Sequence, residues 1–182
     1  MGIIKFFKEL SNFTKVVTDA AKAASEESAE LPVLRADMDD DALFETAVER
    51  IDILVELNEE DAENAPLTLP QRYCYALNLL ELEVNNGGLC QFFVNSSRLA
   101  APWVSDGLAA IGAKEHKELF DGFINKYNIN VNDLSSFAIR RVRDFEKQAK
   151  RYPFDEYDDQ FYTLPSLQEP LTAYIRQHLD EF

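Results

Sequence analysis

The chain has 182 residues, of which 46% are hydrophobic and 12% aromatic, and this is enough apolar material for one folded domain of ordinary size. Its 33 acidic residues outnumber its 18 basic residues, so the formal net charge is -15. This balance argues against direct nucleic-acid binding, which needs Lys and Arg to neutralise phosphates, and it favours a cationic partner. Excess negative charge also serves plain solubility, so charge alone does not define a site.

The N-terminal segment is expected to be a helical arm that precedes the main domain. Residues 3–24 place apolar side chains on one helical face and lysines largely on the other, which predicts a short amphipathic helix. Such a helix docks on its own domain, on a partner, or on an anionic membrane surface, and a protein surface is favoured because the helix has only four lysines. Residues 1–38, which also include a small, acidic linker, are interpreted as one region and residues 39–182 as the domain.

Residues 26–63 carry most of the negative charge, because they hold fifteen acidic residues and two basic ones. Residues 39–57 repeat apolar side chains with the period of a helix. The side expected to be buried comprises Leu43, Phe44, Ala47, Val48, Ile51, Leu54 and Val55. Acidic residues recur elsewhere on this helix at spacings of three or four, and these form the acidic row: Asp41, Glu45, Glu49, Asp52 and Glu56. Three further acids extend the row: Glu59, Glu60 and Asp61.

The acidic row admits two interpretations. Four residues of helix advance about 6 Å, which is similar to the separation of successive phosphates along a DNA strand, so the row is suited to occupy phosphate-binding Lys and Arg side chains. Like charges at these spacings also repel each other by a few tenths of a kcal/mol per pair. The alternative is that the row is the ordinary solvent-facing side of a helix in an acidic protein.

A central helix is predicted over residues 69–84, which are apolar almost all round. Thr68 and Gln71 form a capping-box pattern at its start. The helix runs into Asn85-Asn86-Gly87-Gly88, and because glycine and asparagine tolerate left-handed backbone conformations, a sharp turn is expected there. The turn is expected to fold the next segment, which includes Phe92 and Phe93, back on the central helix.

The residues from Glu83 to Phe93 carry a resemblance to a known family. They resemble the Glu-Val-x-Asn-Gly-Gly-x-x-Gln-Phe-Phe core of the bacterial DNA-mimic protein family, although Leu89 stands where members most often have Phe. A second matching block runs from Asp155 to Tyr162. The resemblance covers roughly the last two thirds of the chain and implies a non-enzymatic protein that occupies the nucleic-acid-binding surface of another protein.

The rest of the chain predicts further helices over residues 100–112, 113–127, 134–151 and 154–164, followed by a C-terminal helix after Pro165. The segment over 134–151 is strongly basic: it contains Arg140, Arg141, Arg143, Lys147, Lys150 and Arg151. If this segment packs beside the acidic row, in the same chain or in a dimer mate, the carboxylates are neutralised and the mimicry interpretation weakens.

The sequence lacks the usual catalytic patterns. No phosphate loop, dinucleotide fingerprint, nucleophile elbow or zinc motif is present. Cys74 and Cys90 are expected to be buried, reduced thiols, and His116 and His178 are expected at the surface. The four acids among residues 155–159 lack the spacing of a calcium loop. No enzyme activity, cofactor or metal is therefore predicted.

Together these observations predict an all-α fold, with a single multi-helix domain around a central apolar helix. The leading functional hypothesis is a cytoplasmic, non-enzymatic DNA mimic whose acidic row and its extension bind a basic DNA-binding protein. The alternative is a toxin-immunity or adaptor protein that binds one partner by shape and charge. No direct nucleic-acid contact and no membrane-spanning helix are expected, and a homodimer is compatible with the sequence.

Overall fold

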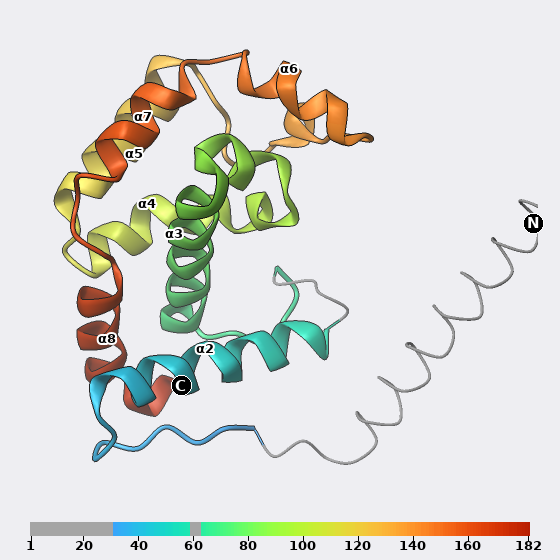
Figure 1. The fold of residues 1–182 in the computed structure, drawn as a ribbon. Coiled ribbons are helices and arrows are strands. Elements are labelled where there is room, and N and C mark those ends of the chain that lie inside the picture. The colour runs from blue at the N-terminus through green and yellow to red at the C-terminus, as the bar shows by residue number, and fades with distance from the viewer. Residues whose placement is uncertain (1–30, 59–62) are drawn as a thin grey trace, which may run out of the picture. The chain divides into compact units, whose positions relative to one another are not determined.

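A computed structural model describes residues 31–58 and 63–182, and the compact unit Pro32–Phe182 is entirely helical where it is described (Figure 1). This confirms the all-α prediction. The α-helices are α2 (Asp40–Glu56), α3 (Leu69–Val94), α4 (Ala101–Ala110), α5 (Lys114–Lys126), α6 (Phe145–Ala149), α7 (Phe154–Phe161) and α8 (Gln168–Gln177). Short 3₁₀ turns occupy Ser96–Ala100, Ser135–Phe137, Val142–Asp144 and Leu179–Glu181. The predicted helix over residues 3–24 lies outside the described residues.

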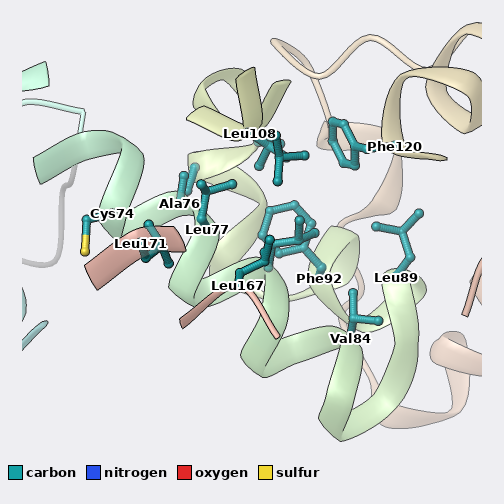
Figure 2. Close-up of a cluster of buried hydrophobic side chains, with 14 of the residues drawn as sticks. Cys74, Ala76, Leu77, Val84, Leu89, Phe92, Leu108, Phe120, Leu167 and Leu171 are labelled. Carbon is teal, nitrogen blue, oxygen red and sulfur yellow. The ribbon is translucent and has the colours of Figure 1, made fainter. Parts of the chain in front are cut away.

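The central element is α3, against which α2, α4, α6, α7 and α8 pack, while α5 packs against α4 and α7 (Figure 1). Its start confirms the predicted capping box: the Gln71 amide donates to the Thr68 hydroxyl at 3.3 Å, and the Thr68 amide donates to the Gln71 side chain at 2.9 Å. Leu77 and Phe92 of α3 meet Leu108 of α4 and Leu167 in one buried cluster (Figure 2). The core is therefore built from residues far apart in the chain.

The two glycines of the Asn-Asn-Gly-Gly sequence reverse the direction of α3. Gly87 has φ -162° and ψ 21°, and Gly88 has φ 81° and ψ 173°, so neither backbone is helical. The Glu83 carboxylate accepts hydrogen bonds from the Asn95 and Gln91 side-chain amides at 2.9 Å and 2.7 Å. In a straight helix, residues 83 and 95 would be about 18 Å apart, so these bonds require the chain to fold back, as predicted. Of the four residues, only Gly88 has a positive φ.

The helices that follow agree with the sequence except in one place. Gly112, with φ 76°, lies just beyond α4 as predicted, and α5 and α7 fall within their predicted ranges. The continuous helix predicted over residues 134–151 is wrong, because this segment forms two 3₁₀ turns and the short helix α6. No residue of α6 is buried, so tertiary packing does not stabilise a longer helix there. Repulsion among the exposed Arg140, Arg141 and Arg143 acts in the same direction.

Candidate partner-binding surface

Helix α2 carries the acidic row and begins at a well-formed cap. The Asp39 carboxylate accepts a hydrogen bond from the Ala42 amide at 2.8 Å, which satisfies one free N–H of the first turn. Four residues of α2 are buried, with exposed fractions of 6% or less: Leu43, Ala47, Ile51 and Val55. These side chains pack α2 against α3 and α8 (Figure 1). Packing on one side fixes which side of the helix the acids occupy.

All five side chains of the acidic row are exposed. From Asp41 to Glu56 the row runs along fifteen residues of helix, or about 22 Å. None of the five forms an ion pair with a basic residue in the described part of the chain. Asp41 accepts one hydrogen bond, from the Gln168 side-chain amide at 3.2 Å. The row is therefore an open line of carboxylates in the part of the molecule that the structure describes.

Two arginines that contact α2 or its start, Arg176 and Arg50, do not pair with the acidic row. Arg176 of α8 donates to Asp40, which precedes the row, at 2.6 Å and also to the backbone carbonyl of Met38 at 2.7 Å. Arg50, on α2 itself, donates to the backbone carbonyl of Pro32 at 2.8 Å. These arginines hold the start of the described unit against α2 and α8, and neither pairs with a carboxylate of the acidic row.

The basic residues of the segment 140–151 do not neutralise the row. Figure 1 places α6 at the far end of the unit from α2. Arg151 donates to the Ser136 backbone carbonyl at 3.2 Å and lies over the Phe137 ring at 5.1 Å. Lys147 is 3.6 Å from Asp144. The lysines of residues 3–24, and the row's predicted extension at Glu59, Glu60 and Asp61, lie outside the described residues.

A shallow groove of about 400 Å³ runs beside the row, lined by both acidic and apolar side chains of α2. Phe44, Val48 and Ile53 contribute its apolar part and are half-buried. Phe44 and Val48 were expected on the buried face of α2, but they are only half-buried and contribute to this surface. Their place at the edge of the apolar stripe was the available signal, because side chains at such an edge contact both core and solvent.

The carboxyl of Asp52, in the acidic row, is partly desolvated. Neighbouring atoms of the groove desolvate Asp52, and this desolvation, together with the nearby Glu56 carboxylate, raises the pKa of Asp52 above its ordinary value. Asp52 therefore loses its negative charge at a higher pH than a fully solvated aspartate does.

The two sequence blocks that carry the family resemblance meet in the structure. The Asp158 carboxylate of the second block accepts a hydrogen bond from the Leu89 amide of the first at 2.8 Å. The Tyr162 hydroxyl donates to the Val84 backbone carbonyl at 2.9 Å. Asp158, one of the four acids among residues 155–159, thus has a structural role, because it caps the helical segment that follows the glycine reversal.

A family comparison adds to this geometry. The family model described as DMP19-like protein matches residues 65–178, which is more than half of the chain. The chain belongs to the DMP19-like protein family. In this DMP19-like chain the matched region contains both blocks, whereas α2 and its acidic row precede it. No significant match was found among curated proteins or among solved structures.

The cysteines and histidines show no arrangement typical of catalysis. Cys74 and Cys90 are buried, unpaired thiols, as predicted, and burial raises the pKa of each to about 12. The surface position predicted for His116 is wrong, because this residue is 4% exposed and its ring lies against Phe161. In the described ranges, no group of three His, Cys, Asp or Glu side chains is placed to hold a metal ion, and no helix there combines the length and apolarity needed to span a membrane.

Proposed function

We propose that the chain is a non-enzymatic DNA mimic whose acidic row occupies the basic surface of a DNA-binding protein. The observation that carries the proposal is the row itself: five exposed carboxylates along one helix, without a cationic partner among the described residues. Membership of the DMP19-like family, a DNA-mimic family, supports it. A partner that contacts phosphates through Lys and Arg side chains would form charge-assisted hydrogen bonds with these carboxylates instead.

The test reverses two charges in the middle of the row, as Glu45→Lys with Glu49→Lys. The wild-type chain, immobilised and exposed to a lysate of its source cells, should capture a basic protein that a short DNA duplex displaces, because both compete for one surface. The reversed variant should capture at least tenfold less of that protein, since it replaces attraction by repulsion at two contacts. Capture is measured by quantitative mass spectrometry with and without duplex competitor.

The control changes the net charge equally at another place. Asp106→Lys with Glu146→Lys alters exposed residues of α4 and α6 that form no ion pair within the described ranges. This variant should retain capture, and both variants should keep the helical circular dichroism of the wild type. Equal capture by the row variant and the wild type would contradict the proposal, as would a captured protein that DNA does not displace.

The apolar part of the α2 groove favours a second candidate function. Phe44, Val48 and Ile53 give a partner something to pack against besides charge, as expected for an adaptor or toxin-immunity protein that binds by shape. The dependence of partner binding on salt concentration distinguishes the two candidate functions. Binding by mimicry should weaken at least tenfold between about 50 and 200 mM salt, whereas a mainly packed interface should change much less.

A further inference from the structure

A second concave surface lies between α5 and α7, on elements that do not carry the acidic row. This cleft has a volume of about 550 Å³, which falls within the range of about 300–1,000 Å³ typical of ligand sites. Its apolar lining includes Leu119 and Phe123 of α5 and Tyr157 of α7. Phe123 and Tyr157 are buried and in ring contact, with centroids 5.5 Å apart, so the aromatic surface is rigid.

Carboxylates from both helices surround the aromatic lining. Glu118 of α5 and Glu156 of α7 are exposed and line the cleft from its two sides. Lys126 is the only basic residue among those lining the cleft, and its ammonium lies over the Tyr127 ring at 5.2 Å. The lining thus has three carboxylates, those of Glu115, Glu118 and Glu156, against one ammonium, and this net negative charge favours a cationic ligand.

A glycine inside α5 gives an independent indication that the cleft is kept open. Gly122 lines the cleft, is exposed, and has ordinary helical backbone angles. A Cβ atom added there would meet no atom within 4 Å. Glycine in a helix interior costs roughly 1 kcal/mol relative to alanine, and no internal contact requires it here. A small residue at this position leaves the helix backbone accessible to a bound group.

We propose that the α5–α7 cleft binds a short peptide segment of a partner protein in which an apolar side chain is flanked by lysine or arginine. The apolar side chain packs against the half-buried Leu119 and Leu164, above the buried rings of Phe123 and Tyr157, while the flanking cations reach Glu118 and Glu156. The open cleft between two helices, with a carboxylate on each side, fits such a segment better than a single charged group. This site is independent of the proposed mimicry by α2.

The probe is the acetylated and amidated tripeptide Arg-Phe-Arg, with Glu-Phe-Glu and phenethylamine as comparisons, titrated into the ¹⁵N-labelled full chain. Amide shifts should move saturably at Leu119, Gly122 and Gln160 with Arg-Phe-Arg, and Glu-Phe-Glu should bind at least fivefold more weakly because its charge is repelled. Gly122→Trp should weaken Arg-Phe-Arg binding at least tenfold by filling the cleft. Glu118→Gln with Glu156→Gln should weaken it severalfold without altering the packing.

Two controls distinguish this site from the acidic row. Gly122→Ala should keep the peptide shifts and raise the free energy of unfolding by roughly 0.5–1 kcal/mol, which shows that α5 tolerates a side chain there. Glu45→Lys with Glu49→Lys should leave the cleft shifts unchanged even if it abolishes partner capture. Shifts confined to α2, equal affinity for the acidic peptide, retention of affinity in Gly122→Trp, or equally tight binding of phenethylamine would each overturn the proposal.

Discussion

At the scale of single residues, His116 illustrates how burial changes the properties of a side chain. Burial lowers the pKa of the His116 imidazole, although the nearby Glu81 and Glu115 carboxylates and a hydrogen bond to the Pro165 backbone partly oppose this shift. Its Nε2 atom is buried and has no hydrogen-bond partner in the described part of the chain. Protonation would place an unpaired charge at this atom, so the folded state favours the neutral ring.

The contribution of His116 to the stability of the chain should therefore decrease as pH falls. As pH falls, His116 is protonated first in the unfolded chain, near pH 6.5. The stabilising contribution of the neutral His116 ring is therefore complete above about pH 6.5 and is lost as pH falls through the lowered pKa of the folded state. Urea unfolding at about pH 7.5 and about pH 5 measures the loss. His116→Phe, which keeps a ring against Phe161, should show a smaller loss, and an identical pH dependence in both proteins would exclude His116 as its source.

The glutamate at position 83 shows how a charge can be used within the fold. Its carboxylate accepts bonds from Gln91, Asn95 and Ser97, so the amides near the glycine reversal stabilise the returning chain. Gln91 and Asn95 therefore stabilise the turn. This carboxylate holds the turn together, in contrast to those of the acidic row.

At the scale of elements, the reversal of α3 depends on the absence of a side chain at Gly88. Its φ of 81° with ψ of 173° belongs to a region that is essentially restricted to glycine, and an added Cβ would clash with the Asp158 carboxylate. The same carboxylate caps the Leu89 amide. The junction of α3 with α7 therefore requires both the positive φ of Gly88 and the close approach of the Asp158 carboxylate to its backbone.

Gly88→Ala should lower the free energy of unfolding by about 2–4 kcal/mol, because it adds backbone strain and displaces a charged hydrogen-bond acceptor. Gly112→Ala is the matched control, since Gly112 has a φ of 76° but its Cβ would meet no atom within 4 Å. That change should cost only about 1–2 kcal/mol of backbone strain. Urea denaturation gives both values, and equal losses would show that the contact with Asp158 is unimportant.

At the scale of the whole molecule, the formal net charge of -15 is distributed unevenly. The acidic row lies on α2, while the exposed arginines 140, 141 and 143 lie toward α6 at the far end of the described unit (Figure 1). Over such a distance the attraction between these groups is strongly screened at physiological salt, where the Debye length is about 8 Å. Repulsion within the acidic row is therefore not cancelled by the basic segment of the same chain.

Salt should therefore stabilise this chain while it weakens partner binding. Raising sodium chloride from about 20 to about 500 mM should raise the melting temperature by a few degrees, because it screens repulsion among the acids. The Glu45→Lys with Glu49→Lys variant should show a smaller rise, since its row is less negative. Differential scanning calorimetry measures both, and a melting temperature that falls with salt would contradict an uncompensated acidic row.

Features that depend on local spacing could be predicted from the amino-acid sequence alone. The period of α2 identified its four buried residues and its exposed acids, although it also assigned the half-buried Phe44, Val48 and Leu54 to the buried side. The Thr68–Gln71 pattern and Gly112 gave helix boundaries that the structure confirms. These features follow from neighbours within a few residues, whose relative positions a helix fixes. The all-α class follows from the same periodicity.

Only the tertiary structure decided which distant residues meet. It placed Asp158 at the Leu89 amide, buried His116, opened the cleft between α5 and α7, and left residues 134–151 without the packing that a long helix needs. Each of these outcomes depends on contacts between segments tens of residues apart, and local periodicity carries no information about which helices pack together. The acidic row could be recognised in the sequence. That none of the described basic residues pairs with it depends on where the other helices pack.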